Sequence, residues 1–241
     1  MQPLSIWVTG EPVPPAAARA GSFADMIRVR TGAAWPGTWS VIDVTDEGAS
    51  LPAVDDVAGV IVTGSPARIA DQLPWMRRVQ DALANLVYAD VPVLGICFGH
   101  QLLGMALGGR SGPNPRGREI GTVTLTLRAS DPIVAGPHSF PVSMTHLDVV
   151  QELPPNATVI ASTALDPHAA IRFAENTWGV QFHPEMNDEI IGDYIASLRD
   201  KLIGEGIDPE ALLASRSDTP HAAGVLARFV ERAAARQSAK R

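Results

Sequence analysis

Residues 93–101 read Val-Leu-Gly-Ile-Cys-Phe-Gly-His-Gln and contain the single cysteine of the chain, Cys97. The apolar residues before Cys97 predict a short buried strand of a parallel sheet. After Cys97, the apolar residues between Leu102 and Leu107 recur at helical spacing, which predicts that a helix begins at the cysteine. A strand that turns directly into a helix is typical of α/β proteins, so this stretch decides the fold class.

Gly95 and Gly99 favour a sharp turn at Cys97, because neither residue has a Cβ atom that would collide within the turn. The turn resembles the nucleophile elbow of hydrolases, with cysteine in place of serine. The sulfur is then expected above the helix N-terminus, where unpaired amide hydrogens and the helix dipole favour a thiolate. A small buried cysteine that fills a helix–strand contact is the alternative, but the two flanking glycines favour an activated thiol.

Three earlier segments rich in β-branched residues, 4–9, 39–44 and 57–63, predict further strands. A helical stripe that includes Phe23 and Ile27 lies between the first two of them, and a second stripe covers residues 73–88. Strands that alternate with helices in this way predict a doubly wound, mostly parallel sheet with helices on both faces.

The second half of the chain has a different pattern. Residues 119–127 alternate threonines with apolar residues, which is typical of a half-exposed strand. Short strands are also expected at 140–144, 158–162, 169–173 and 178–182, because turn residues separate these segments. Together they predict a small antiparallel layer added to the parallel sheet.

A length of 241 residues, with 46% hydrophobic and 19% charged residues, favours one domain that spans the whole chain. We expect a catalytic core over residues 1–203, followed by a connection and a last helix within residues 204–241. This helix is expected to begin at Pro220, and Arg228, Arg232 and Arg236 are expected on its solvated face.

Composition excludes several kinds of partner. No apolar run approaches the roughly 20 residues that span a bilayer, so no membrane is expected. The net charge of −7 argues against nucleic acid, because phosphate binding needs a basic surface. The N-terminus lacks the pattern of a secretory signal, and one cysteine cannot form an internal disulfide, so a cytoplasmic location is expected.

A cysteine nucleophile needs a base that takes its proton and a third group that orients the base. His183 and Glu185 offer both, because residues i and i+2 of an extended segment project to the same side and Pro184 fixes the backbone between them. Alone, His-Pro-Glu is also compatible with a surface turn. Together with the cysteine elbow it predicts a catalytic triad of Cys97, His183 and Glu185.

An oxyanion hole needs backbone amides that point at the carbonyl oxygen. The amide of Gly64 is one candidate, since the strand before it is expected beside the Cys97 strand, and the amide of Phe98 is the second. An ordinary turn is the alternative for Gly64. His146 and Asp148 are expected to form a pair in a loop near the site, and without a third ligand they do not predict a metal.

Three motifs resemble the signatures of the class I (triad) glutamine amidotransferase family, and they lie at residues 63–66, 95–101 and 181–185. Segments 117–121 and 145–149 resemble its free-standing, GMP-synthase-glutaminase-like members. The resemblance extends from the first strand to Glu185 and implies a flavodoxin-like sheet. It also implies hydrolysis of the side-chain amide of L-glutamine through a γ-glutamyl thioester, with release of ammonia and with no cofactor.

The resemblance also assigns roles to individual residues. Cys97 is the nucleophile, His183 acts as base and then as acid, and Glu185 orients His183. Gln101 contacts the bound glutamine, and backbone groups of the segment with Thr145, His146 and Asp148 hold its amino-acid end. The sequence shows no phosphate-binding loop of the P-loop type, so the ammonia is expected to pass to a separate synthetase.

Two alternatives stay open. A free-standing γ-glutamyl hydrolase would cleave γ-glutamyl amides or peptides through the same thioester. A non-catalytic regulatory protein on the same fold is the third possibility, although all three triad members are present.

Overall fold

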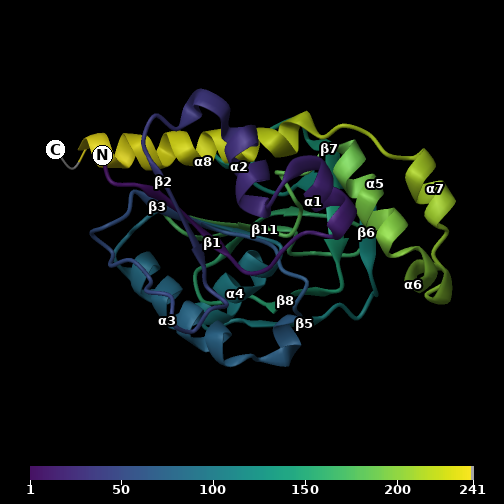
Figure 1. The fold of residues 1–241 in the computed structure, drawn as a ribbon, viewed down its shortest axis with the longest axis horizontal. Coiled ribbons are helices and arrows are strands. Elements are labelled where there is room, and N and C mark those ends of the chain that lie inside the picture. Colours follow the sequence, from purple (N-terminus) through teal and green to yellow (C-terminus); the bar gives the residue numbers. More distant parts are fainter. Residues whose placement is uncertain (240–241) are drawn as a thin grey trace.

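The computed structural model describes residues 1–239 and contains a nine-stranded sheet with helices on both faces (Figure 1). The strand order is β2-β1-β3-β4-β11-β10-β9-β6-β7. The parallel part consists of β1 (Leu4–Val8), β2 (Trp39–Asp43), β3 (Gly59–Val62), β4 (Val93–Ile96) and β11 (Thr177–Val180). The predicted fold class is therefore confirmed, and β3 lies beside β4 as expected.

Antiparallel strands continue the same sheet beyond β11. They are β10 (Ala170–Ala174), β9 (Thr158–Ser162), β6 (Glu119–Leu127) and β7 (Ser139–His146). A separate antiparallel pair is formed by β5 (Arg110–Pro113) and β8 (Asp148–Glu152), two strands that the sequence patterns did not predict. The strands expected in the antiparallel layer thus all belong to the main sheet, and the one expected at 178–182 corresponds to β11, which pairs parallel with β4 and antiparallel with β10. The small separate sheet is formed by β5 and β8.

Helices bury apolar stripes against both faces of the sheet (Figure 1). The helices α3 (Pro74–Tyr88) and α4 (Phe98–Ala106) lie on one face, and α2 (Phe23–Thr31) and α8 (Pro220–Ala239) lie on the other. In α8 the buried stripe recurs every three or four residues, at Ala222, Val225, Leu226, Phe229, Val230 and Ala233. This spacing places every apolar side chain of the stripe on the core side of the helix.

Shorter helices flank the edge of the sheet near β6 and β7. They are α1 (Pro14–Ala20), α5 (Asp188–Ser197), α6 (Arg199–Gly204) and α7 (Pro209–Ala214), with 3-10 turns η1 (Gly32–Ala34) and η2 (Ile69–Asp71) elsewhere. The segment expected as a connection before the last helix therefore contains α7. Its N-cap Asp208 accepts hydrogen bonds from the amides of Glu210 and Ala211, which is why so short a helix forms there.

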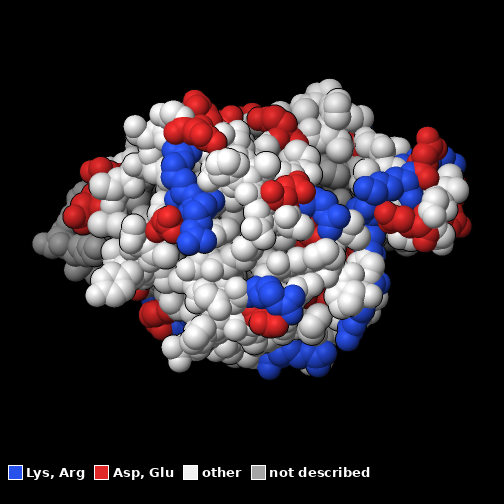
Figure 2. Space-filling model, turned by 90° about the horizontal axis from the view of Figure 1, so that it is seen from below, with Lys and Arg blue, Asp and Glu red and all other residues white. Residues whose placement is uncertain are grey.

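Charged side chains of both signs are interspersed over the face shown in Figure 2. Neighbouring opposite charges give this face no single sign, so it does not form a continuous basic surface for phosphates. No helix within residues 1–239 combines the length and the apolarity needed to traverse a bilayer.

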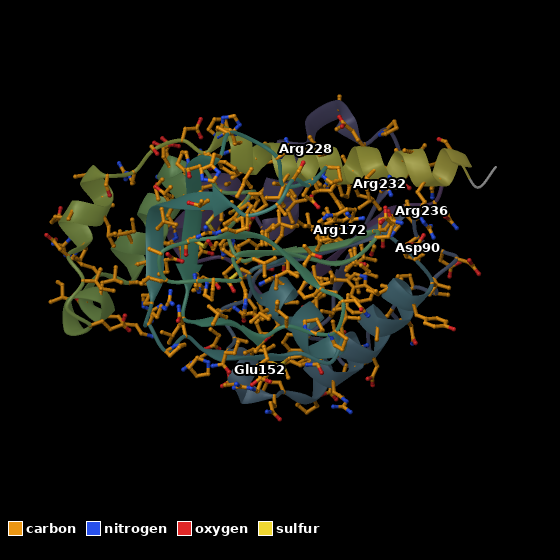
Figure 3. All side chains as sticks on the ribbon, turned by 180° about the vertical axis from the view of Figure 1, so that it is seen from behind. Asp90, Glu152, Arg172, Arg228, Arg232 and Arg236 are labelled. Carbon is orange, nitrogen blue, oxygen red and sulfur yellow. The ribbon has the colours of Figure 1, made fainter. Side chains whose placement is uncertain are left out.

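The arginines of α8 follow the expected solvated face only in part, because Arg232 is exposed whereas Arg228 and Arg236 are half-buried. Arg228 Nε donates to the carbonyl oxygen of Ile133 at 2.7 Å, and Arg232 Nε donates to Asn176 Oδ1 at 2.8 Å. Arg236 pairs with Asp90, as Figure 3 shows. Because their partners lie in the loops before β7, β11 and β4, these arginines attach the helix to loops that connect the strands.

Candidate active site

Cys97 occupies a strained turn between β4 and α4. Its backbone angles are φ 50° and ψ −101°, a left-handed φ that a non-glycine residue rarely adopts. A Cβ atom on Gly95 would lie 2.5 Å from the carbonyl carbon of Gly99, and one on Gly99 would lie 2.5 Å from the carbonyl oxygen of Val62. The two glycines therefore permit the turn for the reason predicted from the sequence.

His183 and Glu185 meet through a turn and not through an extended segment, which corrects the expectation. Strand β11 ends at Val180, and the amide of Met186 donates to the carbonyl oxygen of His183 at 3.3 Å. Pro184 occupies the second position of this turn, where its fixed φ is favourable. The turn brings Glu185 Oε1 to 2.7 Å from His183 Nδ1, so the expected pair is formed by a different backbone geometry.

The thiol and the imidazole converge on Gly64. A Cβ atom there would lie 2.8 Å from His183 Cε1 and 3.6 Å from Cys97 Cβ. The carbonyl oxygen of Gly64 accepts a hydrogen bond from Thr9 Oγ1 at 2.8 Å, which holds the peptide in place. Among residues 1–239, the amides of Gly64 and Phe98 have no backbone partner outside the helices and strands. Phe98 lines the cavity beside Cys97, whereas Gly64 is buried and does not line it.

Two opposite effects act on the buried imidazole. Burial lowers the pKa of His183, but the carboxylate of Glu185 and the sulfur of Cys97 outweigh it and raise this pKa from 6.5 to about 10. His183 Nε2, the nitrogen that Glu185 does not contact, has no hydrogen-bond partner among the described residues. The arrangement therefore favours an imidazolium that points its free nitrogen away from Glu185.

Gln101 lies on α4 one turn after Cys97 and is buried. Its Nε2 atom donates to the carbonyl oxygen of Asp148 at 2.7 Å. The carboxylate of Asp148 is paired with Arg68, whose Nε atom lies 3.3 Å from Asp148 Oδ2. The sequence did not indicate Arg68, because its position depends on how the loop after β3 lies against the start of β8.

The expected loop pair of His146 and Asp148 is wrong in its chemistry. His146 ends β7 and Asp148 begins β8, and His146 Nε2 binds the carboxylate of Glu119 at 3.1 Å. Only the backbone carbonyl of Asp148 contacts the ring, 3.2 Å from Nδ1. The pairing of β6 with β7 places Glu119 opposite His146, a register that no local pattern reveals. Thr145, half-buried, precedes His146 on β7.

A cavity of about 260 Å³ is bordered by most of these residues, but Gly64 and Glu185 do not line it. Its walls include the predicted Cys97, Phe98, Gln101, Thr145, His146, Asp148 and His183, and residues that were not predicted, Glu11, Val13, Phe23, Arg68, Tyr194 and Lys201. The ring of Phe23 stacks on His183 with centroids 6.3 Å apart. Burial, with the negative charges of Glu185 and Cys97, raises the pKa of Tyr194. In residues 1–239, no three His, Cys, Asp or Glu side chains are grouped as a metal site would need.

Gln181 is a further site residue, and the sequence patterns assigned it no role. It is fully buried, and its Nε2 atom lies 3.4 Å from the sulfur of Cys97. Its position in the Gln-Phe-His-Pro-Glu motif was a signal, but only the structure shows that its side chain faces the cysteine.

Gly64→Ala is expected to lower kcat for the reaction predicted at Cys97 roughly hundredfold, because the added methyl group displaces the imidazole of His183. Gly204→Ala is the matched control, since a Cβ atom there meets nothing within 4 Å. Steady-state kinetics of both variants, with thermal melting to monitor folding, check this expectation. Equal kcat values for the two variants would show that Gly64 does not set the imidazole position.

A family model described as "Glutamine amidotransferase class-I" matches residues 38–198. The chain is 40% identical over 143 residues to a GMP synthase [glutamine-hydrolyzing] of Thermomicrobium roseum, which covers 57% of this chain and 25% of the synthase. It therefore spans about a quarter of the length of such synthases. It is also 35% identical over 150 residues to a GMP synthase [glutamine-hydrolyzing] subunit of Pyrococcus abyssi, covering 61% of this chain and 77% of the Pyrococcus protein.

Two other proteins are similar in different ways. The chain is 28% identical over 149 residues to gamma-glutamyl peptidase 3 of Arabidopsis thaliana, and this match covers 59% of this chain and 60% of the peptidase. The crystal structure of a glutamine amidotransferase from Thermotoga maritima superimposes with a TM-score of 0.72 at 20% identity, covering 97% of this chain and 98% of that one. At that identity the likeness concerns the fold alone.

Proposed function

The chain belongs to the class I glutamine amidotransferase family, and on this basis we propose that it hydrolyses the side-chain amide of L-glutamine to glutamate and ammonia. The observation that carries the proposal is the convergence of Cys97 and His183 on Gly64, with Glu185 bound to the opposite nitrogen of the imidazole. This is the order of nucleophile, base and orienting group that acyl transfer needs.

In the proposed mechanism, His183 carries a proton, consistent with a His183 pKa of about 10, and Cys97 reacts as the thiolate. The thiolate attacks the side-chain carbonyl carbon of glutamine, and the amides of Gly64 and Phe98 bind the resulting oxyanion. His183 donates its proton to the departing nitrogen, so ammonia leaves and a γ-glutamyl thioester forms. His183 then takes a proton from water, the resulting hydroxide cleaves the thioester, and Cys97 is regenerated as glutamate leaves.

The amino-acid end of glutamine is assigned to the wall of the cavity formed by Gln101, Thr145, His146 and Asp148. Two side-chain contacts with one backbone carbonyl group support this assignment. Gln101 and His146 both contact the carbonyl oxygen of Asp148, which fixes the peptide of this segment beside the cavity. A rigid wall of this kind orients a substrate at little entropic cost.

The ammonia is proposed to serve a separate synthetase. The similarity to a protein named as one subunit of a GMP synthase supports a glutaminase that works with a second chain.

A γ-glutamyl peptidase is the second candidate, and the similarity to gamma-glutamyl peptidase 3 favours it. The same thioester would form, and an amine or amino acid would leave in place of ammonia. A non-catalytic role on the same fold is the least supported, since Cys97 and His183 line one cavity and Glu185 binds the imidazole of His183.

The test is an assay of the purified chain alone against L-glutamine and a γ-glutamyl dipeptide, with glutamate as the common product. We expect kcat/KM to be at least about tenfold higher for glutamine, a ratio that small differences in leaving-group binding can produce. Cys97→Ala is the blank for both substrates. Faster turnover of the dipeptide without a partner would reject the amidotransferase assignment and favour the peptidase.

Glu185→Gln is expected to lower kcat about hundredfold, because a neutral amide holds the His183 ring less firmly and no longer stabilises its charge. The variant also changes how stability depends on pH. Since the pKa of His183 is raised from 6.5 to about 10, its protonated form stabilises the folded chain fully below about pH 6.5, and this stabilisation is lost as the pH rises through about 10.

Urea denaturation of the wild type and of Glu185→Gln, at pH values between 6.5 and 10, measures this effect. The free energy of unfolding is expected to decline with pH more steeply in the wild type. Parallel declines in the two proteins, together with an unchanged kcat, would show that Glu185 neither charges nor orients His183.

A further inference from the structure

We infer that Gln181 is a positioning residue for the nucleophile, whose side-chain amide holds the sulfur of Cys97 as the last member of a directed hydrogen-bond chain. This hydrogen-bond chain links the carbonyl oxygen of Asp148, the side chain of Gln101, the side chain of Gln181 and the sulfur of Cys97. The inference rests on the proposed role of Cys97, and it assigns a function to a buried group that the triad does not use.

The direction of the chain follows from its first member. The carbonyl oxygen of Asp148 can only accept, so the amide nitrogen of Gln101, 2.7 Å away, must face it. The same nitrogen has a second hydrogen, which it donates to Gln181 Oε1 at 3.2 Å. With its oxygen fixed on Gln101, Gln181 must present its nitrogen to Cys97, where it lies 3.4 Å from the sulfur.

The surroundings prevent Gln181 from adopting another orientation. Its side chain is fully buried, and that of Gln101 is 3% exposed. The carbonyl oxygen of Gln101 accepts a hydrogen bond from Ser111 Oγ at 2.9 Å, which ties this part of α4 to β5. Reversing either amide would place two oxygens or two donors against each other without water to relieve them.

The hydrogen bond from Gln181 Nε2 affects the ionisation of the Cys97 sulfur. A donor stabilises a thiolate more than a neutral thiol, because hydrogen bonds to ionised acceptors are the stronger ones. The titratable groups that act on Cys97 include His183, which follows β11, and Tyr194 of α5, and Glu185 acts through its bond to His183. His183 places a positive charge near the sulfur. Gln181 fixes the position of the sulfur at the elbow while the substrate binds.

The test is the rate of Cys97 alkylation by iodoacetamide as a function of pH. Iodoacetamide is small and uncharged, and it reports the thiolate without requiring glutamine hydrolysis. Gln181→Met keeps the length of the side chain and removes the donor, and Gln181→Glu puts an acceptor against the sulfur. We expect the pH midpoint of alkylation to rise by about one unit in Gln181→Met and further in Gln181→Glu.

The matched control is Gln80→Met. Gln80 is a half-buried glutamine on α3 whose amide also faces a sulfur, that of Met105 at 3.9 Å, but it lies outside the cavity. The pH midpoint of Cys97 alkylation in Gln80→Met is expected to equal that of the wild type. In glutamine hydrolysis, Gln181→Met is expected to lower kcat about tenfold with a much smaller change in KM.

Gln101→Met is an independent test of the hydrogen-bond chain. This variant leaves Gln181 in place and removes the Gln101 amide that orients Gln181. We expect a smaller rise of the midpoint in this variant, and no further rise when it is added to Gln181→Met. Unchanged midpoints in the folded variants at 181 and 101 would overturn the inference. Absence of glutaminase activity in the wild type would instead reject the proposed function and leave the alkylation result interpretable.

Discussion

Cys97→Ser is expected to lower kcat for glutamine hydrolysis by on the order of 10⁴-fold, the loss that follows when the nucleophile of a triad is removed. Serine is nearly isosteric with cysteine, so the strained turn between β4 and α4 is retained. Its hydroxyl is a far weaker acid than a thiol, and His183 then has no thiolate to pair with. The residual rate is expected from substrate binding and the oxyanion donors alone.

Steady-state assays of glutamate formation measure this loss, and thiol titration supplies an internal check because Cys97 is the single cysteine. Thermal melting of Cys97→Ser and of the wild type verifies that both are folded. Hydrolysis at the full rate in Cys97→Ser or Cys97→Ala would mean that another residue is the nucleophile, or that the cavity is not the reaction site.

His183→Asn is expected to cost on the order of 10³-fold to 10⁴-fold in kcat, because the variant has no group that can move a proton between sulfur, leaving nitrogen and water. It is also expected to destabilise the fold. His183 is 2% exposed and Glu185 is 1% exposed, so the variant leaves a buried carboxylate without its partner. Removing one member of a buried pair typically costs about 3–5 kcal/mol.

A double variant separates these two effects. His183→Asn combined with Glu185→Gln places two neutral amides in the buried site, so the charge penalty disappears while the proton carrier stays absent. The free energy of unfolding, measured by urea denaturation, is expected to recover most of the loss, and kcat is expected to stay low. Recovery of activity together with stability would show that His183 has a structural role only.

The parts of this molecule that were predictable are those that local patterns encode. The elbow follows from Gly95 and Gly99, and the structure reproduces it with a left-handed φ at Cys97. The strands of the parallel sheet follow from short β-branched runs, and the long helices α3 and α8 follow from apolar stripes with the helical period. Each of these signals lies within a window of about 20 residues and needs no knowledge of distant contacts.

Short helices without a long apolar stripe were missed. Helix α1 consists mainly of proline and alanine, and α7 has only six residues. Helix α5 was missed although Asn187 caps it and Asp188 and Glu189 occupy its first turn, a signal that the sequence does contain. Tyr194, which lines the cavity, lies on α5 and was missed with it.

Contacts that depend on register were out of reach for sequence patterns. His146 finds Glu119 because β6 and β7 pair at that position, 27 residues apart in the chain. Gln181 faces Cys97 across 84 residues, after β4 and β11 pair in parallel. The three sequence motifs therefore indicated which segments form the site, whereas the hydrogen-bond partners of each polar side chain follow from tertiary packing.

Every role assigned to the cavity depends on Cys97 forming the covalent bond to the γ-carbonyl carbon of the substrate, with His183 beside it. Peptide mass mapping tests this bond after the chain is inactivated by a glutamine analogue that carries an electrophilic ketone in place of the amide. We predict one label, on Cys97, with protection by L-glutamine and no labelling in Cys97→Ala. Inactivation accompanied by a label on any other residue would contradict the proposed role of Cys97.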